Sequence, residues 1–84
     1  MVEERAIRRL IGGIEGLATV ADTVGADENL FERGLDSFGS VQLMLALEEH
    51  YGIEFPDHML NRRSFSTIRI IQETVAALSF GAAA

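Results

Sequence analysis

Residues 36–57, DSFGSVQLMLALEEHYGIEFPD, contain the strongest helix signal in the chain. Asp36 and Ser37 are both residue types that cap helix N-termini, and a helical run follows them at once. Gly52 stands where a C-cap glycine belongs, and Pro56 prevents an immediate restart of the helix. The pattern therefore predicts a helix over 37–51 that begins at a serine.

This predicted helix carries more apolar surface than one buried face requires. Two apolar stripes run along it, one made by Leu43, Ala46, Leu47 and His50 or Tyr51, and one made by Phe38, Val41 and Leu45. Either both stripes pack into the core, or the second stripe is an exposed docking face. The sequence leaves both interpretations open.

Toward the N-terminus, apolar residues recur at three-to-four spacing and predict an amphipathic helix over 3–17. Gly12, Gly13 and Gly16 weaken its second half, because each glycine costs about 1 kcal/mol relative to alanine. Residues 18–36 show no sustained period, and a loop of this length in a small domain tends to be functional. Apolar residues such as Leu30 and Leu35 predict that the loop is ordered and pinned across the helices.

Toward the C-terminus, Asp57 is a candidate cap for a short helical turn through Met59 and Leu60. Ser66 is a candidate cap for a last helix, with a frayed tail expected over 80–84. No segment shows the alternation of a β-strand. We therefore expect an all-α fold, a small four-helix bundle of three long helices and one short helix, with a long first loop and one domain over 1–84.

The composition restricts the classes of function. The net charge of −6 comes from 13 acidic and 7 basic residues, so binding to a nucleic acid is not expected, whereas a partner with a basic patch is favoured. The absence of cysteine excludes disulfides and thiol nucleophiles. The start of the chain lacks the pattern of a signal peptide, and no apolar run is long enough to span a bilayer. We expect a cytoplasmic protein with no membrane contact.

Few side chains suggest catalysis. His50 and His58 lie eight residues apart in the sequence without cysteines, so the pattern favours solvated histidines and no metal site. Ser37 is not part of a nucleophile elbow, and no phosphate-binding loop is present. A hydroxyl at a helix N-terminus is nevertheless exposed, and the free N–H groups there favour a phosphate. Ser37 is either the site of a phosphodiester or only a helix cap.

The stretch 36–57 resembles the second helix and following turn of the acyl carrier protein family almost position for position. The matching pattern is Asp-Ser-apolar, then Glu48-Glu49, an aromatic residue at Tyr51, and the run from Gly52 to Pro56. The segment 30–35 is similar to the one that leads into the family's serine. The segment 65–68 is similar to the start of its last helix. The resemblance extends over residues 28–78.

The resemblance implies that Ser37, flanked by Asp36, receives 4′-phosphopantetheine from coenzyme A through a phosphopantetheinyl transferase and Mg²⁺. The thiol of this arm then holds cargo as a thioester. The chain would be a monomeric, non-catalytic carrier that also meets a loading ligase and a downstream transferase or synthase. The resemblance implies that partner enzymes contact an apolar ridge of Phe38, Val41 and Leu45 with Glu48 on its acidic flank. We also expect partner contacts from Gln42, Arg62 and Arg63, which depart from the family pattern.

Three departures from the family pattern suggest a specialised carrier. Family members commonly have acidic residues where this chain has Gly39 and Gln42, the region 57–63 looks longer than usual, and Arg62 and Arg63 replace acidic residues. The cluster 55–65 also resembles bacterial carriers that receive amino acids from ligases similar to truncated seryl-tRNA synthetases. Polyketide, peptide-synthetase and other acyl carriers remain alternatives. A helical interaction module without a prosthetic group is the alternative from another class.

Overall fold

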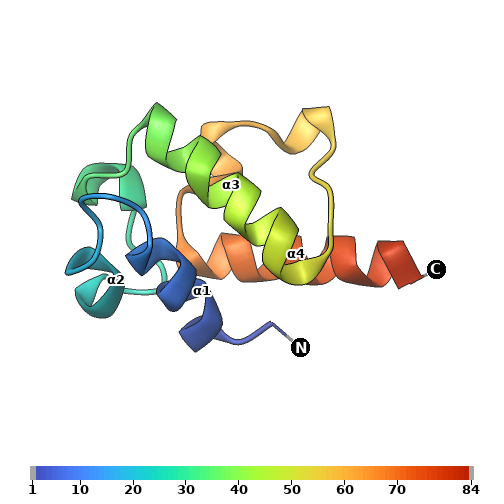
Figure 1. The fold of residues 1–84 in the computed structure, drawn as a ribbon, viewed down its shortest axis with the longest axis horizontal. Helices are drawn as coiled ribbons and strands as arrows, with labels where there is room; N and C mark the ends of the chain where they lie inside the picture. The colour runs from blue at the N-terminus through green and yellow to red at the C-terminus, as the bar shows by residue number, and fades with distance from the viewer. Residues whose placement is uncertain (1, 84) are drawn as a thin grey trace.

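The computed structural model describes the backbone of residues 2–83 and the side chains of residues 2–79. Within this range the chain forms four α-helices and three 3₁₀ helices and no β-strand (Figure 1). The elements are α1 (Glu4–Gly12), α2 (Val20–Thr23), η1 (Leu30–Arg33), α3 (Ser37–Tyr51), η2 (Asp57–Met59), η3 (Arg62–Phe65) and α4 (Ile68–Ala83). The all-α fold class predicted from the sequence is confirmed.

The first helix is shorter than the sequence predicts. The expected helix over 3–17 ends at Gly12, and the N–H of Gly13 bonds to the carbonyl of Leu10 at 3.1 Å. Gly16 adopts a positive φ of 86°, which an α-helix does not allow. The three glycines therefore stop the helix, and Ile14 and Leu17 reach the core from the following turns.

The long segment between α1 and α3 is ordered, as expected, and holds the short helix α2 and the turn η1. Its buried side chains include Leu30 and Leu35. Backbone hydrogen bonds join this segment to the start of α4. The N–H of Leu30 donates to the carbonyl of Ser66 at 2.7 Å, and the N–H of Arg69 donates to the carbonyl of Ala26 at 3.0 Å. This segment thereby fixes the approach of the chain to Ser37.

Helix α3 has the predicted bounds and contacts α1, α4 and η3 (Figure 1). Gly52 closes it in the left-handed conformation at φ 64°. Leu43 and Leu47 are fully buried. In contrast, Phe38, Val41 and Leu45 are 70, 51 and 54 % exposed, so the interpretation that both apolar stripes form core is wrong.

Two expected caps in the second half are wrong. Asp57 makes no capping hydrogen bond with its side chain, because Pro56 occupies the N-cap position of η2. Ser66 has helical backbone angles and continues the turn of η3, so Thr67 caps α4 instead, its hydroxyl accepting from the N–H of Ile70 at 3.0 Å. The short helix expected at 57–60 is a 3₁₀ turn, and the fourth α-helix is α2.

The sequence also predicts a frayed tail over 80–84. The structure describes only the backbone of residues 80–83 and nothing of residue 84, so this prediction lies largely outside the described residues.

Gly39 faces inward, which corrects the interpretation that its lack of charge alters a docking surface. A Cβ at Gly39 would lie 3.0 Å from Leu35 Cδ1 and 3.2 Å from Asp36 Oδ1. The Gly39→Asp variant should therefore lose about 1–3 kcal/mol of unfolding free energy, since it adds a buried carboxylate beside Asp36. Urea unfolding measures the loss, with exposed Gly13→Asp as the control. Equal stability of the two variants would contradict the packing of Gly39.

Candidate functional site

Ser37 is the first residue of α3, and its side chain is exposed. Asp36 caps the helix instead: its backbone is extended, and its Oδ1 accepts from the N–H of Gly39 at 2.7 Å. Among the described residues the Ser37 hydroxyl takes part in no hydrogen bond, and only the Ser37 carbonyl is engaged, by the Ser40 hydroxyl at 2.8 Å. The alternative that Ser37 serves only as the helix cap is therefore wrong.

The surroundings of the Ser37 hydroxyl suit a covalently attached phosphate. The first N–H groups of a helix have no partner within the helix, and its dipole places a partial positive charge there. A phosphodiester formed on Ser37 Oγ would therefore be attached at the positive end of α3. Because Asp36 already satisfies the N–H of Gly39, modification of Ser37 would leave the cap intact.

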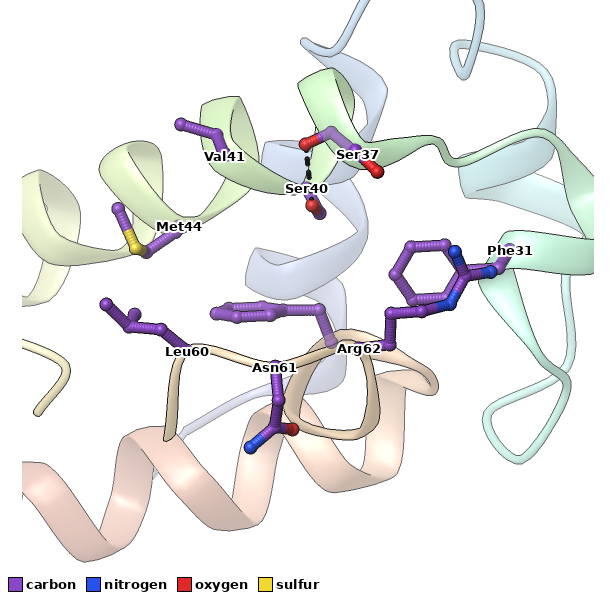
Figure 2. Close-up of a pocket in the computed structure, with 9 residues that line it drawn as sticks. Phe31, Ser37, Ser40, Val41, Met44, Leu60, Asn61 and Arg62 are labelled. Atoms are coloured by element: carbon purple, nitrogen blue, oxygen red, sulfur yellow. Dashed lines mark hydrogen bonds between the residues drawn. The ribbon is translucent and has the colours of Figure 1, made fainter. Parts of the chain in front are cut away.

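A pocket of about 380 Å³ opens beside Ser37 between α3 and the segment that holds η2 and η3 (Figure 2). It is lined by Phe31, Ser37, Ser40, Val41, Met44, Leu60, Asn61, Arg62 and Phe65. Four of these residues stand on α3 at positions i, i+3, i+4 and i+7 from Ser37, which is one helix face. That spacing was a signal for Ser40 and Met44, which sequence reasoning missed.

Arg62 is the cationic residue of this pocket. Its guanidinium carbon lies 4.0 Å from the centroid of the Phe31 ring, a cation–π contact. The backbone around Arg62 is fixed by Asn61, whose Oδ1 accepts from the N–H of Ser64 at 3.0 Å and caps η3. Phe31 was not predicted as a site residue, because no local pattern indicates which distant side chain a loop residue will contact.

The neighbouring residues Arg62 and Arg63 are both exposed but have different surroundings. Arg62 lines the pocket beside Ser37, and Arg63 does not. Both were expected to contact partners. Of the two, only Arg62 lines the pocket that Ser37 also lines.

The other residues expected to bind partners have different environments. Phe38, Val41 and Leu45 form an exposed ridge along α3, and Leu60, which was not predicted, is 46 % exposed. Gln42 is half-buried.

Glu48 is half-buried and has a structural contact. Its Oε2 accepts from the N–H of Phe55 at 2.9 Å and so ties the turn after α3 to the helix. One of its carboxylate oxygens is therefore committed within the chain, which the sequence did not predict.

The titratable groups with shifted pKa values do not line the pocket. A hydrogen bond from Arg69 lowers the pKa of Asp27, and burial raises the pKa of Tyr51. His50 and His58 are exposed. Within residues 2–83, no three potential metal ligands cluster together, and no helix is long and apolar enough to cross a membrane.

Comparison with known proteins agrees with this geometry. Residues 5–76 match the family model described as a phosphopantetheine attachment site. The aminoacyl carrier protein of Agrobacterium fabrum is 45 % identical over 75 residues, which are 89 % of this chain and 90 % of that protein. D-alanyl carrier protein 2 of Lactiplantibacillus plantarum is 47 % identical over 53 residues, covering 62 % of this chain and 66 % of that protein.

Solved structures show the same fold. A carrier protein from Agrobacterium tumefaciens, crystallised with AMP and an engineered glycine:[carrier protein] ligase from Bradyrhizobium japonicum, matches with a TM-score of 0.82 at 44 % identity. The match covers 88 % of this chain and 99 % of that chain. A solution structure of an A. tumefaciens protein matches with a TM-score of 0.73 at 43 % identity, covering 94 % of this chain and 95 % of that chain.

The matched range of the family model, residues 5–76, includes Ser37. The free, exposed hydroxyl fits covalent attachment, and the pocket with Arg62 beside it fits an anionic group. The chain therefore belongs to the phosphopantetheine-binding carrier proteins, whose 4′-phosphopantetheine is covalently attached, and among them to the aminoacyl carrier protein family.

Proposed function

We propose that this protein carries a small amino acid on a 4′-phosphopantetheine arm attached to Ser37 and presents it to partner enzymes. The arm supplies a thiol that holds the amino acid as a thioester. The observation that carries the proposal is the free hydroxyl of Ser37 at the start of α3, with the capping role taken by Asp36. The protein acts as a cytoplasmic monomer, and its chain is one carrier domain.

The Ser37 hydroxyl is the nucleophile when the arm is attached by a phosphopantetheinyl transferase with Mg²⁺. Ser37 Oγ forms a bond to the pantetheine-side phosphorus of coenzyme A, and the bond from that phosphorus to the bridging oxygen of the pyrophosphate breaks. Adenosine 3′,5′-bisphosphate leaves, and the hydroxyl proton passes to a base of the transferase. Exposure of Ser37 allows this approach, and the pocket beside it leaves room for the new group.

Partner enzymes dock on the exposed ridge of Phe38, Val41 and Leu45. These three large apolar side chains are at least half exposed to water. Burying their apolar surface against a partner lowers the free energy, so it favours association. The ridge lies on the same helix as Ser37, so an enzyme seated there also faces the arm. Selectivity by charge and hydrogen bonding comes from Gln42, Glu48, Arg62 and Arg63.

Two observations support a small amino acid as the cargo. The A. tumefaciens carrier, at 44 % identity, is bound to a glycine:[carrier protein] ligase in its crystal structure. Inside this chain, Phe55 and Phe65 are buried with their ring centroids 5.3 Å apart, and two large rings in a small core leave less room for a long acyl chain. The loading enzyme is a ligase of the seryl-tRNA-synthetase-like kind, and a downstream transferase or synthase receives the cargo.

A loading assay tests this proposal. The protein with its arm attached is incubated with ATP and a glycine:[carrier protein] ligase, in parallel with glycine, alanine, serine and leucine, and its intact mass is followed. We expect a mass gain with a small amino acid and none when the arm is absent. Loading by a fatty-acyl or malonyl transferase, with no gain from any amino acid, would overturn the proposed cargo. A mass gain that requires the arm would also exclude an interaction module without a prosthetic group.

Charge reversal on η3 tests the partner contact. The double variant Arg62→Glu with Arg63→Glu should lower kcat/KM for amino acid loading about tenfold or more, because it inverts two exposed charges that we propose contact the ligase. Both side chains are exposed, so the fold should survive, which circular dichroism checks. The single variant Arg63→Glu isolates the partner contact, since Arg63 does not line the pocket. Unchanged loading by both variants would remove these arginines from the interface.

A further inference from the structure

Arg62 is a positioned cation without an acidic partner among the described residues. The three salt bridges there involve Arg8, Arg33 and Arg69, and none reaches Arg62. Its guanidinium is held at 4.0 Å over the Phe31 ring, and its backbone follows the Asn61 cap of η3. A long exposed side chain that is already oriented loses less conformational entropy when it binds an anion.

The pocket beside Ser37 is polar at one end and apolar at the other. In Figure 2, Ser37, Phe31 and Arg62 lie toward one end, and Met44 and Leu60 toward the other. Its volume of about 380 Å³ is in the range of pockets that bind small organic groups. The attachment point, a cation and apolar side chains thus line a single pocket.

We infer that Arg62 binds the phosphodiester of the arm on Ser37 and directs the arm along this pocket in the unloaded carrier. The inference rests on the proposed attachment at Ser37 and adds a positioning residue to it. A phosphodiester carries one negative charge, and a guanidinium donates two parallel N–H bonds to such a group. Because the arm is tethered at the rim of the pocket, the contact forms within one molecule at a high effective concentration.

The chemical groups of the arm match the kinds of side chain that line the pocket. The phosphate comes first and meets Arg62, and the gem-dimethyl carbon that follows it meets the apolar side chains of Val41, Met44 and Leu60. The Ser40 hydroxyl donates to the Ser37 carbonyl, and its lone pairs remain free to accept from an amide N–H of the arm. The unloaded thiol end would then lie along α3, close to the docking ridge.

Phosphorus NMR of the arm-bearing protein tests the inference. The probe is the arm phosphodiester, compared in the unchanged chain, in Arg62→Gln and in the matched control Arg63→Gln. We expect the phosphorus line of Arg62→Gln to narrow about twofold, because the phosphate gains fast local motion. The line of Arg63→Gln should match that of the unchanged chain. The Arg62 Nε–H resonance should also move when the arm is attached.

The outcomes separate this inference from the proposed function. If the arm attaches, but the phosphorus line width is the same in all three proteins and the Arg62 resonance does not move, the role of Arg62 is overturned and Ser37 remains the attachment site. If no arm can be attached to the folded protein, both proposals fall. An equal narrowing in both glutamine variants would indicate general loss of charge and would also overturn a specific contact by Arg62.

Discussion

Replacing Ser37 by alanine should abolish attachment of the arm, and with it the proposed amino acid loading, while the fold remains. The loss is complete, because a methyl group cannot form the phosphodiester bond. The unfolding free energy should change by less than about 0.5 kcal/mol, since the Ser37 hydroxyl has no hydrogen bond among the described residues and Asp36 supplies the cap. Intact mass after the transferase reaction and urea unfolding measure the two effects.

Two control variants make this result specific. Ser40→Ala removes a hydroxyl three residues away on α3 and should still accept the arm. Asp36→Ala removes the cap and should cost about 1 kcal/mol of stability, more than Ser37→Ala does. A Ser37→Ala variant as destabilised as Asp36→Ala would show that the serine is a structural cap after all.

Truncating Leu43, a side chain in the core, should produce a large loss of stability. The side chain is fully buried, so Leu43→Ala loses transfer free energy and leaves a cavity, together about 2–5 kcal/mol. A domain of 84 residues has a total stability of about 4–13 kcal/mol, so this is a large fraction of it. Urea unfolding of the arm-free protein measures the change.

The matched control is Leu45→Ala, the same substitution two residues along the same helix. Leu45 is 54 % exposed, so its truncation should change stability by less than about 0.5 kcal/mol. Loading by the partner enzyme should instead weaken, because Leu45 belongs to the exposed ridge on which we propose that partners dock. Similar stability losses in both variants would contradict the division of α3 into a buried and an exposed stripe.

The sequence predicts α3 well because its signals are local. A cap at Asp36, a helical run and a left-handed Gly52 lie within seventeen residues, and the observed bounds Ser37–Tyr51 follow from them. The candidate Ser37 was found for the same reason, with the resemblance to acyl carrier proteins adding the chemistry. The choice between Asp36 and Ser37 as the cap required the backbone angles, since both residue types suit that position.

The features that sequence reasoning missed depend on packing between distant segments. The contact of Arg62 with Phe31 joins η3 to η1, and no periodicity in either segment indicates it. Gly39 looked like a missing surface charge, but it lies where a Cβ would crowd Leu35. The cap of α4 moved from Ser66 to Thr67 because η3 extends the turn by one residue, which neighbouring serine and threonine residues do not reveal.

The most direct test of the carrier role is the intact mass of the protein after incubation with coenzyme A, Mg²⁺ and a broad-specificity phosphopantetheinyl transferase, followed by peptide mapping. The account predicts a gain of one phosphopantetheine unit, located on Ser37 and absent from Ser37→Ala. No gain on a folded sample with several transferases, or an arm located on another serine, would contradict it.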